Sequence, residues 1–254
     1  MLIDSHCHLD AAEFDADRDA VHAAALAAGV GCIVVPAVAV DGFAKTKSVV
    51  AAYAGCVAAY GIHPLYVTGA GEADVAILRD WLAAERPVAV GEIGLDFYAG
   101  EADRARQERF FAEQLKLARE FSLPVILHVR RAVDRVLWHL RQAGVRGGIA
   151  HAFNGSRQQA DEFIRLGFAL GFGGAATFSG STRIRALAAA LPLEAIVLET
   201  DAPDIPPAWL NRARNSPAEL PAIAAEVAAL RGIAPAELAA ATTANARRIL
   251  SLTG

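Results

Sequence analysis

Short apolar segments alternate along the chain with longer segments in which apolar residues recur at helical spacing. The clearest helical segment spans 104–123, where Phe110, Leu115 and Leu117 are placed for an apolar stripe. The apolar runs lack polar alternation over most of their length, as expected for parallel strands buried on both faces. Eight such runs occur, at 2–8, 32–37, 56–62, 87–96, 124–130, 147–153, 168–174 and 195–203.

Strand and helix alternating eight times predict parallel strands joined by right-handed crossovers. The fold class is therefore α/β, and the length favours one (β/α)8 TIM barrel over residues 1–254 as a single domain. The competing fold is an open doubly wound sheet, whose mark is a G-x-G-x-x-G turn after a strand. The nearest match, "GVGCIV" at 29–34, lacks the third glycine and precedes a strand. The barrel is the preferred interpretation.

Composition narrows the class of protein. Hydrophobic residues make up 54% of the chain, but no apolar run approaches the roughly 18 residues that a membrane span requires. The three cysteines form no C-x-x-C motif, and no basic-then-apolar leader precedes the first strand, so we expect a reducing, cytoplasmic setting without membrane attachment. The net charge of −4 argues against extensive non-specific binding to duplex nucleic acid.

Polar residues that bind metals are concentrated at the ends of the predicted strands, where a barrel of this kind carries its chemistry. Five of the seven histidines lie there. His6 and His8, one residue apart, share a strand face. Alternation also places Glu199 and Asp201 together. The residues concerned are His6, His8, His63, Glu92, His128, His151 and Asp201.

Alternation predicts which apolar side chain accompanies each polar one. His128 is expected to share a face with Ile126, and Asp201 with Val197, so that the apolar residue fills a barrel layer and the polar residue caps it. The same rule groups Glu92 with Val90, Gly94 and Asp96 in one series. It groups His151 with Ile149 and Phe153 in another.

Each of these residues alone has an ordinary explanation. A single buried histidine is most often a hydrogen-bonded core residue, and a strand-end carboxylate often caps the next helix. Together, however, so many imidazoles and carboxylates at one mouth would be costly to bury without cations. Six ligands exceed what one catalytic metal uses, so two divalent ions fit better. Glu92 is then the natural bridge, with His6, His8 and Asp201 on one ion and His128 and His151 on the other; Zn, Mg and Mn all remain open.

Several motifs together resemble one known family. In order along the chain they are "DSHCHLD", "GIHP", "VGEIGLDFY", "LPVILHVR", "HAFNGS", "LETDAP", "RNSP" and "TTANARRIL". This set is similar to the TatD family of metal-dependent hydrolases in the amidohydrolase superfamily. The resemblance implies a (β/α)8 barrel, a two-metal site on the same six ligands, and 3′→5′ exonuclease activity on DNA. The chain departs from the family at "HVRRA", "HAF" and "DAPDIPP", all near the mouth, so the substrate need not be DNA.

The hypothesis for mechanism is hydrolysis by a water whose pKa is lowered by two cations, with Asp201 as general base. Glu199 and Asp96 are expected to orient ligand histidines. The resemblance places His63 at a phosphate, and Arg130 and Arg131 are candidates for the flanking phosphate of a DNA 3′ end. The alternatives are a small phosphoester or a C–N bond as substrate, and a non-catalytic metal-binding protein. No obligate protein partner is expected.

Overall fold

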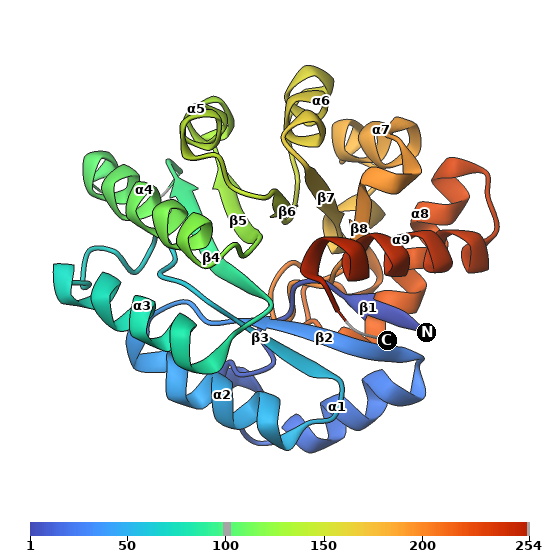
Figure 1. Ribbon diagram of the computed structural model, residues 1–254. Helices are drawn as coiled ribbons and strands as arrows, with labels where there is room; N and C mark the ends of the chain where they lie inside the picture. Colours follow the sequence, from blue (N-terminus) through green and yellow to red (C-terminus); the bar gives the residue numbers. More distant parts are fainter. Residues whose placement is uncertain (99–102, 253–254) are drawn as a thin grey trace.

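The protein is described by a computed structural model that places residues 1–98 and 103–252. Its eight strands form one parallel sheet in sequence order from β1 to β8, and Figure 1 shows the helices arranged around it. The predicted (β/α)8 barrel is confirmed. The strands are β1 (Leu2–Asp4), β2 (Val30–Pro36), β3 (Cys56–Tyr60), β4 (Ala89–Asp96), β5 (Val125–Arg130), β6 (Gly148–Ala150), β7 (Phe168–Phe172) and β8 (Ile196–Leu198).

Helices follow the strands as the sequence pattern predicts. They are α1 (Arg18–Ala27), α2 (Phe43–Ala52), α3 (Glu72–Glu85), α4 (Arg104–Glu120), α5 (Val133–Ala143), α6 (Arg157–Arg165), α7 (Thr182–Ala190), α8 (Leu220–Arg231) and α9 (Pro235–Leu250). The helix expected over 104–123 ends at Glu120, because Ser122 adopts a left-handed conformation (φ 55°) before Pro124. Over the described residues, none of the helices is long and apolar enough to span a membrane.

Two apolar layers stabilise the barrel. The inner layer takes one side chain from every strand and includes residues of α9. Helix α9 packs against β1 and β8, and Figure 1 shows it lying across this part of the barrel. A larger cluster fills the space between the strands and the helices. The inner layer consists of Ile3, Val34, Ala59, Ala89, Ile126, Ile149, Ala169 and Val197, with Ala246, Ile249 and Leu250 of α9.

The predicted alternation holds in β5 and β8, where Ile126 and Val197 belong to the inner layer. It fails in β4: Val90 packs in the outer layer, because the pairing of β4 with β5 shifts register between Val90 and Ile93. It also fails for Phe153, which packs in the outer layer. There β6 ends at Ala150 and Ala152 turns the chain with a φ of 45°. Glu92 nevertheless reaches the mouth of the barrel.

Main-chain hydrogen bonds join the segments that continue β1 and β8. The amide of Ser5 donates to the carbonyl of Leu198 (3.0 Å), and the amide of Asp201 donates to the carbonyl of His6 (2.8 Å). Asp201 takes a left-handed conformation (φ 58°), which an aspartate tolerates better than most residues. The two ends of the sheet are thereby held so that His6 and Asp201 lie next to each other.

Candidate metal centre

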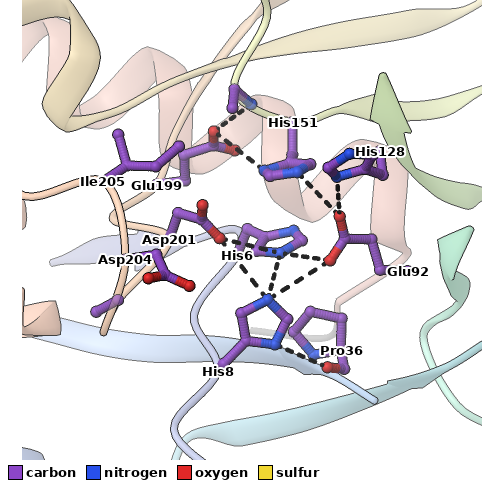
Figure 2. A network of polar contacts seen from close by, with 12 residues as sticks. His6, His8, Pro36, Glu92, His128, His151, Glu199, Asp201, Asp204 and Ile205 are labelled. Carbon is purple, nitrogen blue, oxygen red and sulfur yellow. Dashed lines mark hydrogen bonds and ion pairs between the residues drawn. The ribbon is translucent and has the colours of Figure 1, made fainter. Parts of the chain in front are cut away.

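All six predicted metal ligands come together at the carboxyl ends of the strands, and Figure 2 shows their side chains converging on one another. His6 and His8 follow β1, Glu92 lies in β4 and His128 in β5, while His151 and Asp201 follow β6 and β8. Glu92 is at the centre, because both of its carboxylate oxygens face imidazole nitrogens.

One group of donors surrounds Oε2 of Glu92. His6 Nε2 lies 3.2 Å from this oxygen and 3.2 Å from His8 Nε2. His8 Nε2 lies 3.5 Å from the same oxygen. Asp201 Oδ1 lies 3.4 Å from His6 Nε2 and 3.7 Å from His8 Nε2. Four ligands of a tetrahedral zinc ion, each about 2.1 Å from the metal, are separated from one another by roughly 3.4 Å. The spacing of this group fits a divalent cation.

A second group surrounds the other carboxylate oxygen, Oε1 of Glu92. His128 Nδ1 lies 2.9 Å from it, His151 Nε2 3.0 Å and His63 Nε2 3.4 Å. The carboxylate therefore offers one oxygen to each group of imidazoles, which is the arrangement that a bridging ligand requires. His63, expected only as a phosphate contact, also lies within this second group.

Hydrogen bonds to the remote ring nitrogens determine which nitrogen can bind a metal. Nδ1 of His8 contacts the carbonyl of Pro36 (3.2 Å), and because a carbonyl only accepts, this nitrogen carries the proton of the neutral ring and Nε2 then has the lone pair. His63 is the opposite case: its Nδ1 accepts from the amide of Leu65 (3.2 Å). Neutral His63 therefore carries its proton on Nε2, the atom that faces Glu92. Neutral His63 thus offers a hydrogen-bond donor to the site, whereas neutral His8 offers a lone pair that could bind a metal.

Two buried carboxylates, Asp96 and Glu199, lie beside the imidazoles of candidate ligands. Asp96 Oδ2 lies 3.2 Å from Nε2 of His128. Glu199 Oε1 accepts from the amide of Ala152 (2.5 Å) and lies 3.7 Å from Nδ1 of His151. Glu199 fits only because β7 has a glycine beside it: a Cβ at Gly171 would lie 2.1 Å from Oε2.

A third polar group holds the strand ends in place, and the sequence analysis did not identify it. Oδ2 of Asp4 accepts from the Thr200 hydroxyl (2.6 Å), and Oδ1 accepts from the Thr200 amide (3.0 Å). The side-chain amide of Asn215 donates to the carbonyls of Thr200 and Asp204 (both 2.8 Å). Thr200 lies between Glu199 and Asp201, so these bonds fix the segment that carries both carboxylates. The only sequence signal was the polar character of Asp4 and Thr200 inside apolar runs.

The electrostatics of the cluster are those of a site that attracts positive charge. Burial favours a neutral Glu92, but the surrounding histidines outweigh it and hold the carboxyl pKa well below its usual value. Burial lowers the pKa of His8, yet the hydrogen bond and charge of Glu92 raise it to about 9. The same balance raises the pKa of His151 to about 10, whereas burial and the neighbouring His151 lower that of His6. Without a metal, protons on His8 and His151 neutralise the carboxylates.

The arginines near the mouth have different surroundings. The guanidinium carbons of Arg130 and Arg131 lie 3.8 Å and 4.5 Å from the ring centre of Tyr98, and both side chains are exposed. Neither has an ion-pair partner among residues 1–98 and 103–252. Arg214 instead forms an ion pair with Asp17 (2.6 Å). It tethers the loop after β8 to the segment before α1.

The fold and the donor set together define the class. A (β/α)8 barrel with imidazoles and carboxylates converging at the carboxyl ends of its strands is the architecture of a metal-dependent hydrolase. The family model described as TatD related DNase matches residues 3–251. The chain belongs to the TatD family.

Individual relatives agree with this assignment over nearly the whole chain. A metal-dependent hydrolase of Escherichia coli, YjjV, is 39% identical over 248 residues, which cover 96% of this chain and 95% of the relative. A 3′-5′ ssDNA/RNA exonuclease TatD of Cronobacter sakazakii is 36% identical over 256 residues, covering 98% and 97%. The crystal structure of the Escherichia coli YjjV protein superposes with a TM-score of 0.96 at 37% identity, covering 99% of this chain and 98% of that one.

Proposed function

We propose that this protein is a 3′→5′ exonuclease that hydrolyses phosphodiester bonds of DNA with two bound divalent ions. The observation that most directly supports this proposal is that two groups of side chains share Glu92, with imidazole nitrogens of one group at each of its carboxylate oxygens. His6, His8 and Asp201 would hold one ion. His128 and His151, which both face Oε1 of Glu92, would hold the other. Likeness to a named exonuclease over 98% of the chain supports the choice of bond. When bound, the ions would supply Lewis acidity toward the phosphoryl group and toward water.

Proton transfer and the orientation of the imidazole rings are assigned to side chains of this protein. Asp201 is proposed to accept a proton from the attacking water, and burial raises the pKa of its carboxyl toward the range useful for a base. Glu199 and Asp96 would hold the rings of His151 and His128 in orientation. Glu92, which faces five imidazoles, fixes the spacing of the whole cluster.

Phosphate recognition is proposed for three cationic or hydrogen-bonding groups at the mouth. His63 presents an N–H from Nε2, which suits a phosphoryl oxygen. Arg130 ends β5 and Arg131 follows it, and both are exposed, so their guanidinium groups are proposed to contact the next phosphate along a strand. Contacts of this kind position a nucleic acid without reading its sequence.

The test is digestion of a 5′-labelled single-stranded oligonucleotide by metal-stripped protein, with Mg²⁺, Mn²⁺ or Zn²⁺ restored in turn. A ladder that shortens from the 3′ end, and that is absent in Glu92→Gln, is the expected result. Glu113→Gln serves as the matched control, because Glu113 lies in α4 and pairs with the exposed Lys116. Metal content is measured on the same samples, and two ions per chain are expected. Four imidazoles with two carboxylates suit zinc and manganese better than magnesium.

The alternative substrates are separated by the same preparation. Protein that holds two ions but leaves the oligonucleotide intact would move the proposal to a small phosphoester or a C–N bond, tested on a panel of nucleotide monoesters, lactones and amides. Protein that holds the ions and turns over none of these would be a metal-binding protein without catalysis. No obligate protein partner is proposed.

A further inference from the structure

An exposed aromatic ring stands directly beside the metal centre. Tyr66 follows β3 by six residues, and its side chain is half exposed. Its ring centre lies 6.1 Å from that of His63, with the two planes 77° apart. His63 in turn points Nε2 at Glu92. A single residue, His63, therefore lies between Tyr66 and the groups that would hold the scissile phosphate.

The backbone of the loop that carries Tyr66 is anchored by several contacts. The amide of Tyr66 donates to the carbonyl of His63 (2.9 Å). The next residue, Val67, is buried against Ile62 and Phe110. Arg106 of α4 donates from Nε to the carbonyl of Val67 (2.6 Å) and from a terminal nitrogen to the carbonyl of Ala70. The anchored backbone therefore holds Tyr66 at a set place beside His63, with half of its side chain exposed.

A second exposed aromatic near this part of the barrel mouth, Tyr98, already has cations over its ring. Tyr98 has the guanidinium groups of Arg130 and Arg131 within 4.5 Å of its ring centre. Tyr66 has no such cation over its ring among the residues that the structure describes. Of the two tyrosines, Tyr66 offers an open face for stacking.

We propose that Tyr66 is a stacking platform for the unpaired nucleobase of the nucleotide whose phosphate lies at the metal centre. This inference rests on the proposed exonuclease function. A flat, rigid, half-exposed ring beside a phosphate site is suited to stack on any base, because every base presents a π face. A paired base cannot leave its stack to reach the ring without an energetic cost. The platform would therefore select single-stranded 3′ ends, whatever their sequence.

The test compares two 5′-labelled single strands that differ only at the 3′ end, one with a normal terminal nucleotide and one with a tetrahydrofuran abasic residue. Base stacking on an aromatic side chain contributes about 1–3 kcal/mol per base by alanine substitution. At a factor of ten per 1.4 kcal/mol, wild type should show a KM about 5- to 140-fold higher for the abasic strand. The rate constant kcat should change much less than KM.

In Tyr66→Ala the KM for the normal strand should rise by a similar factor, and the difference between the two strands should disappear. Tyr66→Phe should retain it. Trp138→Ala is the matched control, because Trp138 is a similarly exposed aromatic on α5 whose ring contacts His139 and Arg135. A base preference that persists unchanged in Tyr66→Ala would overturn the inference.

A binding readout separates this inference from the proposed function. With 2-aminopurine at the 3′ end, stacking quenches its fluorescence whether or not the strand is cut. Quenching by wild type that is lost in Tyr66→Ala, without hydrolysis under any metal, would support the platform and refute the exonuclease. Hydrolysis with equal KM for both strands would refute the platform alone. Neither quenching nor hydrolysis would overturn both.

Discussion

Gly171→Ala should weaken metal binding without touching any metal ligand. The new methyl group would lie 2.1 Å from Oε2 and 2.6 Å from Cδ of Glu199. Ordinary contact begins near 3.4 Å, so the carboxylate has to move by roughly 1 Å. Its bond to the amide of Ala152 is only 2.5 Å long and cannot survive that shift. His151 then loses the group that faces its Nδ1.

The size of the effect follows from what Glu199 does. Loss of a carboxylate that orients a ligand histidine typically lowers metal affinity by 10- to 100-fold, or about 1.4–2.7 kcal/mol. Overpacking at the strand costs a further ~1–3 kcal/mol of unfolding free energy. Glu199→Gln should lower metal affinity by a similar factor but leave the unfolding free energy nearer to wild type, because the amide has almost the same volume.

The assay is competition for zinc between metal-stripped protein and a fluorescent chelator of known affinity. Gly180→Ala is the control, because a Cβ at Gly180 would meet no atom within 4 Å. In the double variant Gly171→Ala, Glu199→Ala the methyl group has no carboxylate to displace, so the two penalties should not add. Wild-type affinity in Gly171→Ala, or strictly additive penalties in the double variant, would refute the reasoning.

Three other results are expected. Asp4→Ala should lower the unfolding free energy in urea by about 2–6 kcal/mol, because it leaves the amide and hydroxyl of Thr200 unsatisfied, whereas Asp4→Asn should cost much less. Arg130→Ala should reduce the slope of log KM against log salt by about 0.7 on single-stranded DNA, and Arg214→Ala, already paired with Asp17, should leave the slope unchanged. Because the pKa of His8 is raised to about 9, a metal must displace its proton at pH 7, so apparent affinity should rise with pH up to that value. Calorimetry in two buffers should show at least one proton released per chain, and none would contradict ligation by Nε2.

Sequence alone predicted that the candidate metal ligands would gather, because each lies at a place that the fold dictates. The carboxyl ends of parallel strands meet at one mouth, so His128 and Asp201 had to lie at the same end of the barrel once the strands were recognised. Alternation worked in β5, where Ile126 lies inside the barrel two residues before His128. This prediction from alternation did not depend on knowing the contacts between strands.

The errors have equally definite causes. Val90 was placed on the wrong side because a register irregularity in β4 resets the alternation before Glu92, and no local signal marks it. Phe153 was misplaced because β6 is only three residues long.

The pairing of Arg214 with Asp17 joins residues about two hundred positions apart, so only the folded chain brings them together. Tyr66 carries no signal in the sequence beyond its place three residues after His63.

The cover that α9 provides has a consequence for synthesis on the ribosome. Ile249 and Leu250 pack on the same inner layer as Ile3, and Asn245 donates to the carbonyls of Leu193 and Ile196 (both 2.8 Å). The N-terminal strand emerges more than two hundred residues before these partners exist. Until α9 has been synthesised, the end of the barrel that this helix covers is open, and the apolar side chains that line it are exposed to water and to chaperones. A nascent chain halted before α9 would therefore expose the apolar side chains of an incomplete barrel. Ribosome-bound chains of increasing length should become protease-resistant only after this helix has emerged.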